Sequence, residues 1–218
     1  MDKENKVICG VLWDMDGVLV DTGEIHFQSW KLALTEVGMP FDRKKFQKVF
    51  GMNNTRILTI LLGHAPEPSF FSKVSDHKES LFRQMIRGIV QPMPGVRDWL
   101  ERLQAMGYRQ AIASSAPMAN IDALVDEMAT RPFFSAIVSA YDLPSKPDPA
   151  VFLEAARQLD LSPKNCIVIE DAVPGVIAAH RAGMRCIAVT ATYPRQDLAE
   201  ADLVVDSLIE LEAENFKC

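Results

Sequence analysis

The sequence predicts an α/β fold, with an open, doubly wound parallel sheet of the Rossmann type and a helical cap domain inserted into it. Two observations favour this fold. Short apolar segments alternate with amphipathic helical patterns over most of the chain, and one long segment near the N-terminus contains helical patterns only. The 218 residues are enough for one sizeable core that carries a smaller insertion.

The predicted strands are short apolar segments. Each is a continuous hydrophobic run rather than an alternating one, which is typical of a parallel sheet covered on both faces. The expected strands cover residues 7–13, 110–113, 135–139, 166–169, 186–189 and, as a weaker sixth, 203–205.

Helical patterns lie between these strands, and proline and glycine mark their ends. Proline is tolerated in the first turn of a helix, and glycine commonly ends one. On this basis helices are expected over residues 96–107, 149–159 and 174–183. Together with the strands they complete the alternation that a doubly wound sheet requires.

The segment from residue 22 to residue 91 breaks the alternation, because it contains no convincing strand. Its helical patterns cover residues 27–37, 55–62 and 71–89, with turns at proline and glycine between them. We therefore expect a helical cap over residues 22–91, and an α/β core made of residues 1–21 and 92–218.

Composition and charge exclude several classes of partner. The chain is 48% hydrophobic and 24% charged, and its formal net charge of −6 argues against binding to nucleic acid or to an anionic membrane. Neither a signal peptide nor an apolar stretch long enough to span a membrane is evident. A cytoplasmic location is expected.

The four cysteines form no C-x-x-C motif. Cys9, Cys166 and Cys186 lie in apolar segments, and Cys218 ends the sequence. We expect all four to be reduced thiols in a reducing cytosol, where cysteine acts as a small hydrophobic residue.

Polar residues follow four of the predicted strands. In open α/β sheets, ligands bind at the carboxyl ends of the strands, so these side chains are expected to meet at one edge. In strand order they are Asp14 and Asp16, Ser114 and Ser115, Lys146, and Glu170 with Asp171.

This set of side chains matches the needs of magnesium-assisted phosphoryl transfer. Mg²⁺ prefers oxygen ligands, which Asp14 and Asp171 can provide, with Glu170 as a third candidate. A divalent cation also explains why carboxylates are placed close together at the end of an apolar segment. Ser114 can donate a hydrogen bond to a phosphoryl oxygen, and Lys146 can neutralise negative charge.

Each of these residues also has a purely structural interpretation. Aspartate before glycine commonly forms an Asx turn, and Glu-Asp before a helix commonly caps it. Ser114 or Lys146 alone would favour the structural interpretation, but the coincidence at four strand ends favours a functional site. An EF-hand is excluded because the glycine of its sixth position and the glutamate of its twelfth are missing. The sequence contains no nucleotide-binding glycine motif either.

Four segments, in order along the chain, carry a family resemblance. They are DMDGVLVDT (14–22), the strand end Ala-Ser-Ser (113–115), SKPDP (145–149) and IEDAVPGVIAAHRAG (169–183). With them the chain resembles the haloacid dehalogenase superfamily, in the branch that has a helical cap after the first strand.

The resemblance implies a role for each core residue. Asp14 would be the nucleophile that forms an aspartyl-phosphate, and Asp16 the general acid/base, whose backbone carbonyl would also bind Mg²⁺. Ser114 and Lys146 would hold the phosphate, and Asp171, with Glu170 as a candidate, the metal. Members of the superfamily that displace halide lack an acid/base at the position of Asp16, so dehalogenase activity is not expected.

The cap resembles two groups of relatives, β-phosphoglucomutases and small sugar-phosphate phosphatases, through the stretch DTGEIHFQSW (21–30). In the mutases a histidine matching His26 couples substrate binding to cap closure, and Lys78 matches a cap lysine. A histidine satisfied by a neighbour near the hinge and a lysine on a solvated helix face remain the alternatives. The expected substrate-binding residues are His26, Asn54, Lys78 and Ser115.

One departure separates these two groups. Mutases carry Lys-Gly-x-Ser-Arg in the cap to grip a second phosphate, whereas this chain has Phe-Gly-Met-Asn-Asn at 50–54, with Lys48 and Arg56 nearby but offset. The prediction is a Mg²⁺-dependent phosphatase of a small phosphomonoester, by resemblance a sugar phosphate, that is a monomer or weak homodimer. The alternatives are a phosphosugar mutase and a non-catalytic module that binds metabolites.

Overall fold

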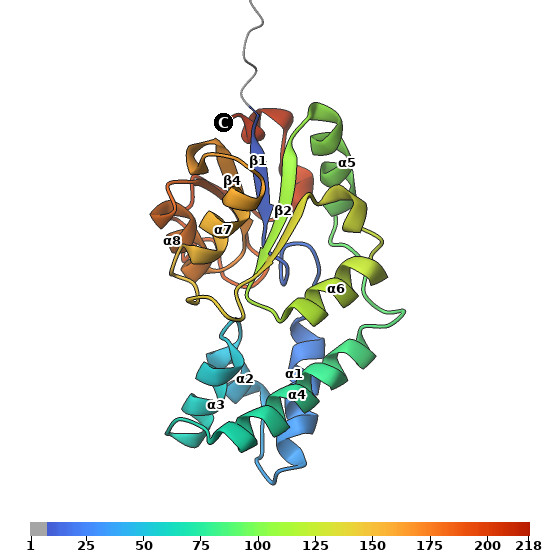
Figure 1. Ribbon diagram of the computed structural model, residues 1–218, viewed down its shortest axis with the longest axis vertical. Helices are drawn as coiled ribbons and strands as arrows, with labels where there is room; N and C mark the ends of the chain where they lie inside the picture. Colours follow the sequence, from blue (N-terminus) through green and yellow to red (C-terminus); the bar gives the residue numbers. More distant parts are fainter. Residues whose placement is uncertain (1–7) are drawn as a thin grey trace, which may run out of the picture.

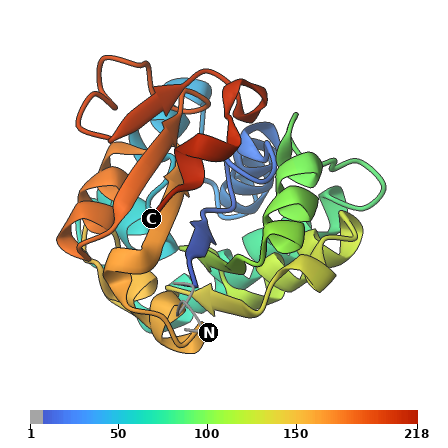
Figure 2. The same cartoon turned by 90° about the horizontal axis from the view of Figure 1, so that it is seen from above.

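The computed structural model describes residues 8–218, which form a six-stranded parallel sheet with helices on both faces (Figures 1 and 2). The strand order is β3-β2-β1-β4-β5-β6, and every neighbouring pair is parallel. The strands are β1 (Gly10–Trp13), β2 (Arg109–Ser114), β3 (Ala136–Ser139), β4 (Cys166–Glu170), β5 (Arg185–Val189) and β6 (Leu203–Val205). The predicted fold class is confirmed.

The two faces of the sheet build two separate hydrophobic clusters, because successive side chains of a strand point to opposite sides. Val11 and Trp13 of β1 pack into the cluster covered by helices α5 (Val96–Met106) and α6 (Met118–Glu127). Leu12 packs on the other face, beneath α7 (Ala150–Gln158) and α8 (Val173–Arg181). Both faces of β1 are therefore buried, which explains its continuous apolar sequence.

Four further helices lie between β1 and β2 in the sequence and form a separate layer at the carboxyl ends of the strands (Figure 1). These cap helices are α1 (Gly23–Thr35), α2 (Arg43–Val49), α3 (Asn54–Leu62) and α4 (Pro68–Met85). They pack around a hydrophobic cluster of their own, which includes Phe27, Trp30 and Leu58. The cap thus has a core that is distinct from the two clusters of the sheet.

The predicted strands agree closely with the observed ones, except at the start of β1. Residue 7, the expected start, lies outside the described residues, and β1 begins at Gly10. Helices α2 and α6 were not predicted. Helix α2 has only 7 residues, of which Phe46 and Val49 are buried. A segment with two buried residues is too short for a helical period to be recognised.

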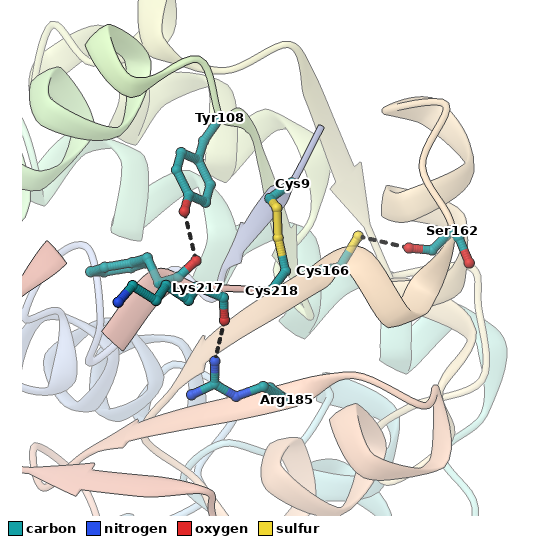
Figure 3. The surroundings of a disulfide bond; sticks show 8 residues. Cys9, Tyr108, Ser162, Cys166, Arg185, Lys217 and Cys218 are labelled. Atoms are coloured by element: carbon teal, nitrogen blue, oxygen red, sulfur yellow. Dashed lines mark hydrogen bonds between the residues drawn. A yellow bond between two sulfur atoms is a disulfide. The ribbon is translucent and has the colours of Figure 1, made fainter. Parts of the chain in front are cut away.

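The prediction of four reduced cysteines is wrong for two of them. Cys9 and Cys218 form a disulfide with a Cα–Cα distance of 6.3 Å, whereas Cys166 and Cys186 are free and buried (Figure 3). The backbone carbonyl of Lys217 accepts a hydrogen bond from Arg185 (2.5 Å), and that of Phe216 accepts one from Tyr108 (2.7 Å). These bonds hold the C-terminal segment beside the start of β1. Local spacing rules could not reveal a pair separated by 209 positions.

No helix within residues 8–218 combines the length and the apolar character needed to cross a bilayer.

Candidate active site

A cavity of about 270 Å³ lies between the carboxyl ends of the strands and the cap. Strand ends and the loops that follow them form one wall, and helices α1, α3 and α4 contribute to the other. All of the site residues predicted from the sequence line it: Asp14, Asp16, His26, Asn54, Lys78, Ser114, Ser115, Lys146, Glu170 and Asp171. The cap and the core also contact each other at the rim, where Asn53 donates to Ser145 Oγ (2.7 Å).

Three buried carboxylates meet where β1 and β4 end. Asp14, Glu170 and Asp171 each offer an oxygen, and these oxygens lie within 4.8 Å of one another. The pairing of β1 with β4 brings them together, because it continues as a hydrogen bond from the Asp14 amide to the Ile169 carbonyl (3.0 Å). Parallel neighbouring strands therefore place acids 156 positions apart in the sequence at one point.

Lys146 is the cation that faces this acidic cluster. Its Nζ lies 2.5 Å from Asp14 Oδ1 and also bonds to Glu170. Burial opposes the positive charge, but Asp14 and Glu170 outweigh burial and raise the pKa of Lys146 above its usual value. The lysine therefore remains charged inside the site.

One lysine does not compensate three acids. Burial raises the pKa of Asp14 to about 7; Lys146 opposes this shift, and repulsion from Glu170 and Asp16 adds to it. Burial, together with repulsion from Glu170 and Asp14, also raises the pKa of Asp171 well above its usual value. A hard divalent cation would relieve this repulsion, so this set of oxygen donors fits Mg²⁺.

Two glycines that the sequence analysis did not single out allow the acids to approach the backbone. Gly17 has a φ of +87°, and a Cβ there would lie 2.0 Å from Asp171 Oδ2. A Cβ on Gly175 would lie 1.9 Å from Glu170 Oε1. The sequence could have indicated both glycines, because Gly17 directly follows Asp16 and Gly175 lies in the first turn of the helix that follows Asp171.

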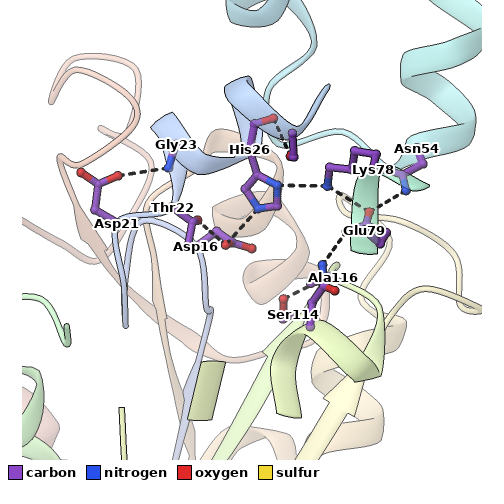
Figure 4. Close-up of polar contacts among 12 residues, drawn as sticks. Asp16, Asp21, Thr22, Gly23, His26, Asn54, Lys78, Glu79, Ser114 and Ala116 are labelled. Atoms are coloured by element: carbon purple, nitrogen blue, oxygen red, sulfur yellow. Dashed lines mark hydrogen bonds and ion pairs between the residues drawn. The ribbon is translucent and has the colours of Figure 1, made fainter. Parts of the chain in front are cut away.

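Ser114 ends β2 at the same edge and is buried. Its Oγ accepts a hydrogen bond from the Ala116 amide (3.1 Å), which fixes the hydroxyl beside the cavity (Figure 4). Ser115 follows it on the cavity wall.

Asp16 faces the cap and joins a chain of polar contacts (Figure 4). Its Oδ1 accepts a hydrogen bond from Thr22 and lies 3.3 Å from His26 Nε2, and Lys78 Nζ lies 3.1 Å from His26 Nδ1. Burial opposes ionisation of Asp16, but the hydrogen bonds from His26 and Thr22 and the positive charge of Lys78 lower its pKa. His26 also stacks on Phe82, with ring centroids 4.3 Å apart.

The remaining cap residues separate into buried and exposed groups. Asn54 is buried and donates to Glu79 Oε1 (2.7 Å). The sequence analysis did not identify Glu79. Arg56 lines the cavity, whereas Lys48 lines a different hollow on the cap. In the described part of the chain, no acidic side chain forms an ion pair with Arg56.

The candidate site is therefore an acidic cleft at the carboxyl edge of a doubly wound sheet, covered by a helical cap. The sequence profile of the haloacid dehalogenase-like hydrolase family matches residues 11–189. The chain is a member of that family.

Its relatives include phosphatases and a mutase. The chain is 31% identical to the chloroplastic 5-amino-6-(5-phospho-D-ribitylamino)uracil phosphatase of Arabidopsis thaliana; the match covers 95% of this chain and 57% of that protein, little more than half its length. It is 33% identical to the β-phosphoglucomutase of Bacillus subtilis, over 94% of this chain and 92% of the mutase.

A solved structure shares the whole architecture. A variant of CbbY from Rhodobacter sphaeroides, in complex with xylulose-(1,5)bisphosphate, superposes with a TM-score of 0.88 at 25% identity. The superposition covers 97% of this chain and 100% of that one.

Proposed function

We propose that this protein is a Mg²⁺-dependent phosphatase that hydrolyses a small phosphomonoester, such as a sugar phosphate, through an aspartyl-phosphate on Asp14. The observation that carries the proposal is the convergence of Asp14, Lys146 and Asp171 in one cavity, with Asp16 on its cap side. The relatives support it, since they include a phosphatase of a phosphorylated ribityl compound and proteins named for, or bound to, sugar phosphates.

In this mechanism Asp14 attacks phosphorus, so that one P–O bond forms as the bond to the leaving oxygen breaks. Asp16 gives its proton to that oxygen. Water then attacks the phosphorus of the aspartyl-phosphate, gives a proton to Asp16 and releases Asp14 and inorganic phosphate. Lys146 and Ser114 stabilise the charge on the phosphoryl oxygens.

The lowered pKa of Asp16 suits the second half of this cycle, in which Asp16 accepts a proton. The first half requires Asp16 to carry one. A phosphate dianion bound beside Asp16 would raise its pKa, because like charges disfavour ionisation. Substrate binding would therefore prepare the acid form, and transfer of the Asp16 proton to the leaving oxygen would restore the base before water attacks.

Asp14, Asp171 and the backbone carbonyl of Asp16 would hold Mg²⁺, with Glu170 as a further candidate. The ion would neutralise the phosphate and the acidic cluster, so that an anionic nucleophile can approach an anionic substrate.

A phosphosugar mutase is the second candidate, because β-phosphoglucomutase of Bacillus subtilis is a relative over nearly the full length of both chains. A mutase must grip a second phosphate in the cap. Residues 50–54 contain no cation, and the charge of the buried Lys78 is paired with Glu79 (2.9 Å), so Arg56 is the remaining cation of the cap wall. This wall favours a singly phosphorylated ligand and hence hydrolysis.

The experiment is an assay of phosphate release from a panel of phosphorylated metabolites, with and without Mg²⁺. We expect metal-dependent release of inorganic phosphate that equals substrate loss, without stimulation by glucose 1,6-bisphosphate. Conversion of β-glucose 1-phosphate mainly to glucose 6-phosphate, accelerated by the bisphosphate, would establish the mutase instead. No metal-dependent turnover of any phosphoester would leave a metabolite-binding module.

A further inference from the structure

Glu79 lies on α4 at the junction between the cap and the core, and it is buried. Its carboxylate is a hydrogen-bond acceptor for three elements of the chain. Oε1 accepts from Asn54 of α3 (2.7 Å) and from Lys78 of α4 (2.9 Å), while Oε2 accepts from Asn120 of α6 (2.5 Å). Of these partners, Asn120 belongs to the core.

The orientation of the Asn120 amide follows from its second partner. Arg83, one turn after Glu79 on α4, donates from Nη1 to Asn120 Oδ1 (2.9 Å). Arginine has only donors, so the carbonyl oxygen of Asn120 must face Arg83 and its amide group must face Glu79. Asn120 is fully buried, and it therefore joins the core to two successive turns of the cap helix.

The same carboxylate fixes the polar chain that leads to Asp16. A charged lysine also has only donors, so Lys78, held by Glu79, must donate to His26 Nδ1. His26 then carries its proton on Nε2 and directs it at Asp16 Oδ1. Asn120 thus positions Glu79, and from Glu79 each member positions the next, through Lys78 and His26 to Asp16 (Figure 4).

We propose that Glu79 is a positioning residue that links the docking of the cap on α6 to the orientation of Asp16. The proposal rests on the proposed function, in which Asp16 is the general acid/base. When α4 contacts Asn120, the carboxylate is held where Lys78 and His26 are aligned. When the cap moves away from α6, Glu79 loses this partner and the alignment of Asp16 is no longer enforced.

A carboxylate is required at this position because all three partners present donors. The substitution Glu79→Gln keeps the size of the side chain but places an amide donor against Asn120 or against Asn54 and Lys78. It also removes the negative charge that favours the ammonium form of the buried Lys78, whose pKa burial lowers.

The first test compares two aryl phosphates that differ in leaving group, p-nitrophenyl phosphate and phenyl phosphate. Phenolate needs protonation more than p-nitrophenolate does, so a misaligned acid slows phenyl phosphate more. We expect Glu79→Gln to reduce kcat for phenyl phosphate on the order of 10-fold more than kcat for p-nitrophenyl phosphate, with little change in KM. In an Asp16→Asn background, Glu79→Gln should cause no further selective loss.

Glu67→Gln is the matched control, because Glu67 occupies the N-cap position of α4, is exposed and makes no side-chain cap bond. It should leave both rates unchanged. Equal losses of both substrates in Glu79→Gln would indicate a merely structural role and overturn the inference. A wild-type protein that releases no phosphate from any ester would instead overturn the proposed function.

The second test is a rescue. Asn120→Asp alone places two carboxylates against each other and should also slow phenyl phosphate. Combined with Glu79→Gln, it gives the introduced amide an acceptor, and the introduced carboxylate still accepts from Arg83. We expect the double variant to be several-fold faster than the product of the two single effects, and its thermal midpoint to recover as well. Purely multiplicative effects would contradict the inferred contact.

Discussion

At the scale of single residues, the pairing of β1 with β4 places three acidic side chains, Asp14, Glu170 and Asp171, close together. Asp14 and Asp171 are buried carboxylates with raised pKa values, and Lys146 compensates only part of their charge. Such an arrangement stabilises the protonated forms unless a cation is bound. Proton binding would therefore compete with the proposed binding of Mg²⁺ at this site.

This competition predicts a dependence of stability on pH. The pKa of Asp14 is about 7 in the folded metal-free protein and near its ordinary value of 3.8 when unfolded. Between these values the unfolded chain has released a proton that the folded protein retains, so stability falls as the pH rises. Mg²⁺ should bind more strongly as the pH rises through about 7, because the carboxylates must ionise.

Thermal unfolding measured with EDTA or with Mg²⁺ between about pH 5 and pH 8 checks this prediction. We expect the midpoint gain from Mg²⁺ to increase with pH, and Asp171→Asn to reduce it. A gain from Mg²⁺ that is equal at all these pH values would contradict the assignment of the cluster as a metal site.

At the scale of secondary structure elements, the turn into α8 depends on close packing against Glu170. Its Oε2 accepts hydrogen bonds from the amides of Asp171 (2.9 Å) and Ala172 (3.0 Å). Gly175 lies directly over this carboxylate. The start of α8, the end of β4 and Lys146 are thus tied together by one side chain.

We predict that Gly175→Ala lowers stability by about 1–3 kcal/mol, because the added methyl group overpacks this contact, and that activity falls with it. Denaturant unfolding and phosphate release measure the two effects. Gly23→Ala is the control: the nearest atoms to the added Cβ would lie at 3.6 and 3.8 Å, and alanine is more favourable than glycine in a helix such as α1. If Gly175→Ala behaved like the control, the close packing would not matter.

The elements also show what the sequence can and cannot reveal. The strands of this sheet were predictable because most of their residues are buried. The candidate residues Asp14, Ser114 and Glu170 could be found because they lie at or directly after strand ends, whereas Lys146 lies seven residues beyond the end of β3. Helix α2 was missed because two buried residues do not establish a period, and α6 because its N-cap is Pro117 with no side-chain cap bond. Glu79 and Asn120 were missed because their partners lie on other elements, which only tertiary structure brings together.

At the scale of the whole molecule, the disulfide closes nearly the entire chain into a loop. Cys9 precedes β1 and Asp14 follows it, so the disulfide and the acidic cluster lie at opposite ends of the same strand. The cross-link should therefore act on stability without reaching the site.

We predict that Cys9→Ser lowers the free energy of unfolding by about 2–4 kcal/mol under oxidising conditions, because the unfolded chain gains conformational freedom. Phosphatase activity of the folded variant should remain at the wild-type level. Denaturant unfolding with and without dithiothreitol provides the measurement. With dithiothreitol, the wild type and Cys9→Ser should have the same free energy of unfolding. Equal free energies without dithiothreitol would show that the cross-link contributes nothing.

The most direct test of the proposed chemistry follows the phosphoryl group itself. The protein is mixed with p-nitrophenyl phosphate and Mg²⁺, quenched in acid within the first turnovers, and digested for mass spectrometry. We predict one transient phosphoryl group on the peptide that contains Asp14, decaying as inorganic phosphate appears and absent from Asp14→Asn. Release of phosphate by the wild type without this intermediate, or at an undiminished rate by Asp14→Asn, would contradict the account.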